Sequence, residues 1–142
     1  MNAQTVVQAF YNAIDSGDLA RAESYMTDDF TFSGAVPRPI GKPEFRAFVD
    51  ALLAAMPDVK LNAKNITVQG SNVSLTVQLT ATHTATLRPI KPGMSSVSAT
   101  GKKITLPQER VNITLRDDKL ASLEVAQVPG GGMPGLLAQI GA

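Results

Sequence analysis

Apolar and polar residues alternate strictly over residues 73–84, which is the clearest pattern in this chain. Every second position is apolar, at Val73, Leu75, Val77, Leu79 and Ala81, and the series ends on His83. A period of two is typical of a strand with one buried face, because successive side chains point to opposite faces. We therefore predict that His83, the only histidine in the chain, points inward at the end of a buried strand face.

Helical spacing dominates the first part of the chain. Apolar residues three and four positions apart predict a helix around residues 6–14 and a short second helix carrying Leu19, Ala22 and Met26. A third helix is expected between prolines 43 and 57, because proline is tolerated in a first turn and stops a helix beyond its end. Its apolar stripe consists of Phe45, Phe48, Val49, Leu52, Leu53 and Met56. A stripe of this width indicates that the helix packs on a sheet.

Strands are predicted in the second part of the chain, near residues 59–68, 73–84, 103–115 and 119–128. Helices followed by strands favour an α+β fold over alternating βαβ units. The apolar parity changes partway along the first and the third of these strands, and each change predicts a bulge, which bends a sheet. We expect a curved antiparallel sheet wrapped around the third helix, forming a cone with a cavity.

Composition excludes several kinds of site. The length of 142 residues is typical of a single domain over residues 1–142. With no cysteine and one histidine, disulfides, a cysteine nucleophile and a multi-histidine metal site are excluded. Lys and Arg total 13 against 12 Asp and Glu, and the net charge of +1 is unlike the basic footprint of a nucleic-acid-binding protein. No apolar run could span a bilayer and no signal-peptide pattern is present, so we expect a cytoplasmic protein without a membrane partner.

Short segments spread over nearly the whole chain resemble the SnoaL-like polyketide cyclase and ester cyclase family of the nuclear transport factor 2-like superfamily. They are residues 10–19, 29–30, 41–42, 45–48, 56–58, 82–84, 100–104 and 135–141. The resemblance implies a cone-shaped α+β barrel, with N-terminal helices packed on a curved antiparallel sheet. It also implies a small-molecule ligand and a homodimer formed through the outer face of the sheet.

Two positions depart from the pattern of that family. Cyclases of the family typically carry an acid/base aspartate on the last strand, and Val125 occupies that position here. The family often has a histidine where this chain has Ser33. Ring closure by an aldol reaction needs a group that moves a proton, and valine cannot do this. A catalytic member with this sequence would need another acid/base, for which His83 and Glu109 are the candidates.

Two registers of the last hairpin remain open. If residues 117–119 form a three-residue loop, Glu109 and Gln127 are neighbours inside the cone. If only the first two of these residues form the turn, Glu124 faces inward instead, because a slip of one residue exchanges the faces of a strand. The first register continues the apolar pattern on both strands, so we favour it and predict Glu109 as the inward carboxylate.

Two functions are consistent with this cone. In the first, the protein is a polyketide cyclase-type or isomerase-type enzyme without cofactor or metal, in which His83 and Glu109 transfer a proton on a small apolar or carbonyl-containing ligand. In the second, it is a non-catalytic ligand-binding or scaffolding module, which the valine at position 125 favours. The residues expected to line the ligand cavity are Tyr11, Ser33, Phe48, Leu52, Met56, Val125 and Gln127.

Both candidate acid/base residues also have structural explanations. His83 could bond a backbone group where its strand meets a loop, and Glu109 could pair with Arg110 or Lys103 at the surface.

Two irregular segments complete the prediction. Residues 85–99 form a long loop that is consistent with a lid or with a disordered or dimer-packing excursion. Arg88 and Lys91 within it favour an anionic or carbonyl-rich ligand. Residues 129–134 predict a flexible glycine and proline hinge before a short helix at 135–140.

Overall fold

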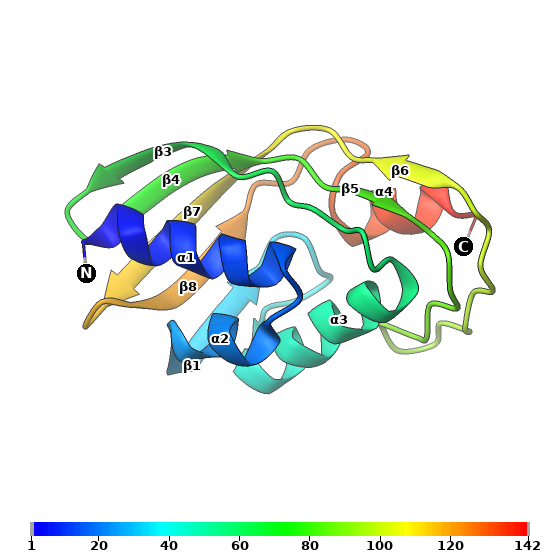
Figure 1. Cartoon of the computed structure of the whole chain (residues 1–142), viewed down its shortest axis with the longest axis horizontal. Helices are drawn as coiled ribbons and strands as arrows, with labels where there is room; N and C mark the ends of the chain where they lie inside the picture. The colour runs from blue at the N-terminus through cyan, green and yellow to red at the C-terminus, as the bar shows by residue number, and fades with distance from the viewer. Residues whose placement is uncertain (1, 142) are drawn as a thin grey trace.

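The computed structural model describes residues 2–141 (Figure 1). The helices are α1 (Ala3–Asp15), α2 (Leu19–Ser24), α3 (Lys42–Ala55) and α4 (Gly132–Gln139). The strands are β1 (Met26–Ser33), β2 (Ile40–Gly41), β3 (Lys64–Gln69), β4 (Asn72–Val77), β5 (Thr80–Thr82), β6 (Lys103–Thr105), β7 (Glu109–Arg116) and β8 (Lys119–Val125).

Capping residues explain where the long helices begin. The Asn2 side chain accepts a hydrogen bond from the Thr5 backbone N–H at 2.8 Å, which satisfies a donor that the first turn of α1 leaves free. At the start of α3, the Glu44 carboxylate accepts the backbone N–H of Gly41 at 3.2 Å, and Pro43 occupies the first turn. The third predicted helix is therefore confirmed nearly at its predicted bounds.

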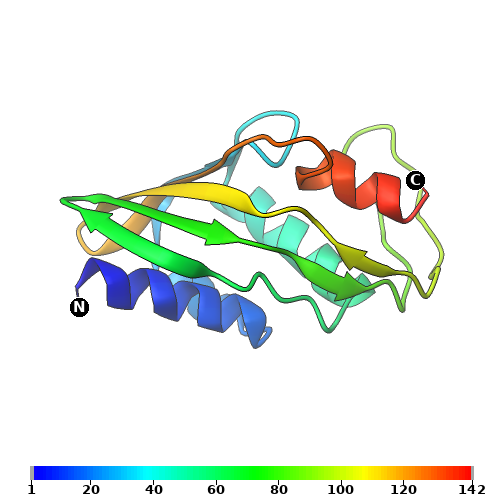
Figure 2. The ribbon, with the colours of Figure 1, turned by 90° about the horizontal axis from the view of Figure 1, so that it is seen from above.

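The main sheet has six strands in the order β2-β1-β8-β7-β4-β3, and β5 pairs with β6 in a separate two-stranded sheet. All pairs are antiparallel except that of β1 and β8, which is parallel. Helix α1 packs on β3 and β4 and α3 packs on β1, so both helices cover the same face, while α4 lies at the far end beside β6 (Figures 1 and 2). The predicted α+β cone is confirmed.

Strands β1 and β2 were not predicted from the sequence, and the placement of Met26 in the second helix is wrong. Helix α2 ends at Ser24, and Met26 begins β1, where it is paired with Leu120 of β8. The register of β1 against β8 shifts between Met26 and Thr31. Such a shift breaks the period of two by which a strand is recognised in sequence, which explains why the pattern was missed.

Irregularities bend the other strands. The register of β3 against β4 shifts between Lys64 and Thr67, so the first predicted bulge is confirmed. The predicted strands 73–84 and 103–115 are each divided in two, giving β4 and β5 and then β6 and β7. Burial nevertheless keeps alternating along 73–84 through to His83, because the chain stays extended across the break.

The last hairpin combines features of both registers considered above. Asp117 and Asp118 form a two-residue turn with φ values of 52° and 61°, as a hairpin turn of this length requires. Away from this turn, the register of β7 against β8 shifts between Leu115 and Thr114, so that Ile113 pairs with Leu123. This bulge restores the inward face of the favoured register, so Glu109 is buried and Glu124 is exposed.

Candidate functional site

The space between α1, α3 and the sheet contains a small hollow, here called the interior cavity, of about 90 Å³. Aromatic rings from the helices and from β1 pack around it, with Phe32 and Phe45 centroids 4.9 Å apart. Its lining is almost entirely apolar and consists of Phe10, Tyr11, Ile14, Phe32, Phe45, Phe48, Val49, Leu52, Val59, Leu61, Val77, Val111, Leu123 and Val125. The structure brings Tyr11, Phe48, Leu52 and Val125 together in this lining.

Tyr11 carries the polar group of this lining. Its side chain is 3% exposed, and burial, with a smaller contribution from the nearby Asp15 carboxylate, raises the pKa of the Tyr11 hydroxyl above its ordinary value. The hydroxyl therefore stays protonated at neutral pH and is able to donate a hydrogen bond.

A larger hollow of about 630 Å³, here called the helix-side cavity, lies on the outer side of α3. Its residues come from α3, from the chain around Val36 to Ile40, from the segment around Arg88 to Pro92 and from α4. Phe48 lines both this cavity and the interior cavity. Ligand pockets commonly have volumes of roughly 300–1,000 Å³, and the helix-side cavity lies within that range.

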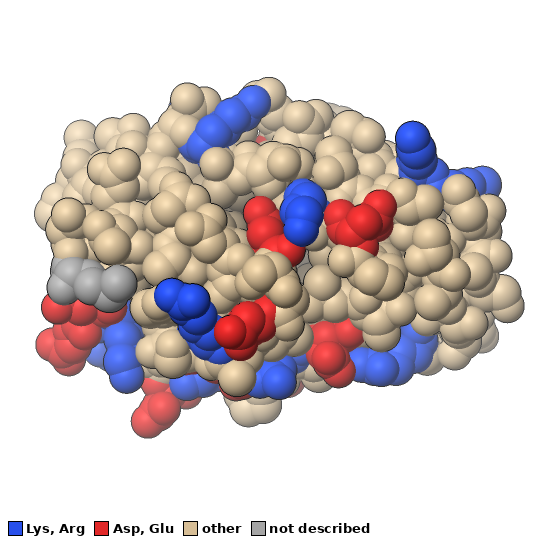
Figure 3. All heavy atoms as spheres, viewed as in Figure 1, with Lys and Arg blue, Asp and Glu red and all other residues tan. Residues whose placement is uncertain are grey.

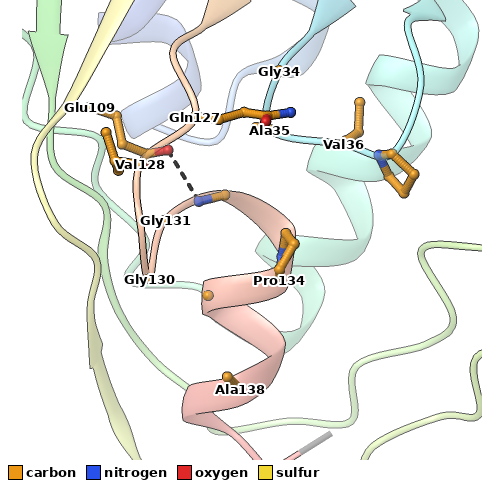
Figure 4. A pocket seen from close by; sticks show the side chains of 13 residues that line it. Gly34, Ala35, Val36, Glu109, Gln127, Val128, Gly130, Gly131, Pro134 and Ala138 are labelled. Atoms are coloured by element: carbon orange, nitrogen blue, oxygen red, sulfur yellow. Dashed lines mark hydrogen bonds between the residues drawn. The ribbon is translucent and has the colours of Figure 1, made fainter.

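A third hollow of about 510 Å³, the glutamate cavity, surrounds the carboxylate of Glu109 (Figure 4). Its walls come from the loop after β1, the chain after β8 and the first turns of α4, with Gln127 beside the glutamate. Val36 and Pro37 line both the glutamate cavity and the helix-side cavity. The glutamate cavity and the helix-side cavity therefore adjoin each other beside α4, and this end of the molecule is here called the open end of the cone (Figure 1).

Glu109 is 4% exposed, and one carboxylate oxygen accepts the backbone N–H of Gly132 at 3.1 Å, the dashed line in Figure 4. Burial raises the pKa of Glu109, and the Gly132 hydrogen bond opposes part of that rise. Since Gly132 opens α4, the carboxylate also caps a helix that has no side-chain cap from Gly131. Glu109 combines the properties of a buried base with those of a helix anchor.

His83 lies in different surroundings, completely buried where β5 leads into the segment that follows. The Thr100 backbone N–H donates to its Nδ1 at 3.3 Å, and the Thr100 hydroxyl lies 3.0 Å from the same atom. Because a backbone N–H can only donate, the neutral ring carries its hydrogen on Nε2, for which no described residue provides a partner. His83 therefore holds the returning end of the 85–99 segment, and the structure does not place it in the lining of the glutamate cavity.

The remaining predicted site residues are divided between core and surface. Met56 is fully buried at the end of α3, and Ser33 is half-buried at the end of β1, where it is paired with Glu124. Neither contributes to the lining of the three cavities described above. Gln127 lies beside Glu109 as predicted, although it is largely exposed to solvent.

The two irregular segments are more ordered than a flexible loop and hinge. Leu87 and Val97 exchange two backbone hydrogen bonds of 2.8 Å, which turns most of the 85–99 segment into a hairpin. Helix α4 begins at Gly132, within the predicted hinge, and buries Leu136, Leu137 and Ile140. Both segments form walls of the open end of the cone.

Within residues 2–141, no group of three or more His, Cys, Asp or Glu side chains is placed to hold a metal ion. No helix in the same part of the chain is both long and apolar enough to cross a membrane.

Helices packed inside a curved sheet, around an apolar hollow, define the nuclear transport factor 2-like class of α+β fold. The chain belongs to the family of the SnoaL-like domain, whose pattern matches residues 7–123. No protein of curated function matches the chain.

Solved structures with the same fold come from several bacteria. AclR of Streptomyces galilaeus, described as a candidate hydroxylase, is 20% identical with a TM-score of 0.75, over 98% of this chain and 80% of that one. A candidate polyketide cyclase of Xanthomonas campestris pv. campestris is 20% identical with a TM-score of 0.73, over 97% and 96%. IdmH of Streptomyces antibioticus, another candidate polyketide cyclase, is 18% identical with a TM-score of 0.73, over 100% of both chains. At these identities the similarity shows the fold.

Proposed function

We propose that this protein binds a small apolar, carbonyl-containing compound at the open end of the cone and moves a proton on it, as a cofactor-independent cyclase or isomerase does. Glu109 is the proton-transfer residue in this proposal, in place of the aspartate that Val125 replaces. The observation that carries it is a buried carboxylate that faces a cavity of about 510 Å³. Two candidate polyketide cyclases with the same fold support the reaction class.

The surroundings of Glu109 suit a base that removes a proton from carbon. Burial raises the pKa of Glu109, so its carboxylate is a stronger base than an ordinary glutamate carboxylate. The Gly132 N–H fixes one oxygen and leaves the other free to accept a proton. Gln127, beside it, offers an amide N–H to a ligand oxygen.

The apolar surfaces around the open end suit the body of such a ligand. Phe48, Leu52 and Val125 offer apolar contact, and the Tyr11 hydroxyl offers a hydrogen bond to a polar group that reaches the interior cavity. In this proposal His83 is a positioning residue that holds the 85–99 segment through Thr100.

Turnover of 5-nitrobenzisoxazole tests this function, because its ring opens when a base removes one carbon-bound proton and the product is coloured. We expect the protein to react faster than acetate at the same concentration, and Glu109→Gln to lose this excess. Glu124→Gln is the matched control, since Glu124 is an exposed carboxylate on the neighbouring strand β8. Equal rates for the protein and acetate would contradict a catalytic role.

That outcome would favour the second candidate function, a non-catalytic ligand-binding module. The observation in its favour is the Gly132 hydrogen bond, because helix capping alone gives Glu109 a structural role.

We also propose that two copies pair through the outer face of the main sheet. A patch of small, polar and uncharged side chains lies there, at Ser74, Thr76, Asn112, Thr114 and Ser122, and it is bordered on the same face by Arg110 and Glu124. A face of this kind can be desolvated at less cost than a charged one. Light scattering after size-exclusion chromatography tests this, and Thr114→Lys is expected to convert a dimer into a monomer.

A further inference from the structure

We infer that the helix-side cavity takes an amphipathic organic anion, whose acidic group lies between Arg38 and Lys91 and whose apolar body lies against Phe48. This inference rests on the proposed function, since it names the class of ligand that enters the open end of the cone. An aromatic or aliphatic carboxylate fits this description.

Only some of the charged residues of this cavity form ion pairs or hydrogen bonds with other residues. Arg88 forms an ion pair with Asp50 at 2.9 Å, and the Glu44 carboxylate accepts the Gly41 N–H at 3.2 Å. Within residues 2–141, no ion pair is recorded for Arg38 or Lys91. Two cations from separate segments of the chain therefore remain available at the edge of the cavity.

The rest of the cavity is apolar. Its carbon surface consists of Val36, Pro37, Ile40, Ala47, Phe48, Ala51, Pro89, Ile90, Pro92 and Met133. Prolines hold both loop walls, so little backbone freedom is lost when a ligand binds between them. A rigid apolar body of ten or so carbon atoms fits within about 630 Å³.

The two free cations are not part of a generally basic surface. The chain has a net charge of +1, and along the lower part of the face that Figure 3 displays Lys and Arg lie close to Asp and Glu. In the lining of the helix-side cavity, Arg38, Arg88 and Lys91 face a single acidic residue, Glu44. The excess of positive charge is thus local and adjoins an apolar hollow, which is the pattern that an amphipathic anion complements.

The test compares naphthalene-2-carboxylate with naphthalene-2-carboxamide by isothermal titration calorimetry on the full chain. The two probes share one apolar body and differ in charge. We expect the carboxylate to bind about fivefold more tightly than the carboxamide at low salt, which is the size of effect that exposed ion pairs give. This preference should fall in 0.5 M NaCl, because the Debye length shortens to roughly 3–8 Å.

Variants of the cavity identify its cations. Arg38→Gln and Lys91→Gln are expected to reduce the preference for the carboxylate and to leave carboxamide binding unchanged. Lys119→Gln makes the same charge change at an exposed position, the first residue of β8, and serves as the control. Its preference is expected to match that of the unaltered protein.

Each alternative outcome is distinct. Equal binding of the two probes would overturn the inference while leaving the cavity as a ligand site. Binding of neither probe would overturn the inference and would also count against the open end of the cone as a binding site. A preference that Lys119→Gln reduces as much as Lys91→Gln would show general charge attraction and would overturn the assigned position.

Discussion

The interior cavity is unfilled space in the core, so filling it should raise the free energy of unfolding, and Val111→Ile tests this. Val111 is 1% exposed on the central strand β7, and its side chain lines the cavity. Isoleucine keeps the branched Cβ that suits a strand and adds one methylene toward the hollow. The change therefore fills space without altering the strand.

The magnitude follows from the size of the cavity. At about 24 cal/mol per Å³, a cavity of about 90 Å³ represents roughly 2 kcal/mol of packing energy that the fold does not realise. One added methylene contributes at most about 0.8 kcal/mol of that amount. We expect the free energy of unfolding to rise by about 0.5–0.8 kcal/mol, and Tm to rise by about 2–3 °C.

Urea unfolding at constant pH measures the effect, with Val73→Ile as the matched control. Val73 is equally buried, at 1% exposed on β4, but the interior cavity does not include it in its lining. The added methylene should therefore overpack the core there and lower stability by roughly 1–3 kcal/mol. If Val111→Ile destabilises the protein as much as Val73→Ile does, the hollow is not free space and the reasoning is refuted.

Three other substitutions test individual contacts. Burial raises the pKa of Glu109 in the fold, so its contribution to stability is complete below the unfolded pKa of about 4.3 and is lost as pH rises through the folded pKa. Glu109→Gln should remove this decline in urea titrations between about pH 4 and pH 8 while keeping an acceptor for Gly132. Gly34 has a φ of 92°, and a Cβ there would lie 1.8 Å from the Val125 carbonyl oxygen. Gly34→Ala should therefore lower the free energy of unfolding by about 3 kcal/mol or more, which a thermal melt detects as a large drop in Tm. His83→Leu leaves the Thr100 N–H without its acceptor and should lower the free energy of unfolding, measured in urea, by about 1–3 kcal/mol. The rate with 5-nitrobenzisoxazole should stay unchanged, because His83 has a positioning role and does not transfer the proton.

Sequence patterns predict the parts of this fold whose burial is regular. The stripe of α3 and the alternation of β4, β5 and β7 identify their buried faces, because one face of each lies against the core throughout. The sequence pattern does not predict β1, because the register of β1 shifts against β8. The predicted second helix was for this reason extended through Met26, which belongs to β1. Periodicity detects burial on one face, and it fails where a bulge moves side chains between faces.

The candidate site shows the same limit. The inward position of Glu109 follows from the parity of β7, and that of Tyr11 from the spacing of α1. The separation of His83 from the glutamate cavity does not follow from parity, which gives only the inward direction of a side chain. Glu109 begins β7 of the main sheet, whereas His83 follows β5 of the two-stranded sheet. Arg38 was missed since no local pattern marks it, and only the loop after β1 brings it to the helix-side cavity.

The pH dependence of 5-nitrobenzisoxazole turnover, compared with the carboxyl-carbon NMR titration of Glu109, tests the central claim most directly. The account predicts that Glu109 titrates above the ordinary pKa of a glutamate, that the rate rises with pH through the same pKa as Glu109, and that Glu109→Gln removes this rise. A Glu109 that titrates at an ordinary carboxyl pKa, or a rate that rises through a different pKa, would contradict the assignment of Glu109 as the proton-transfer residue.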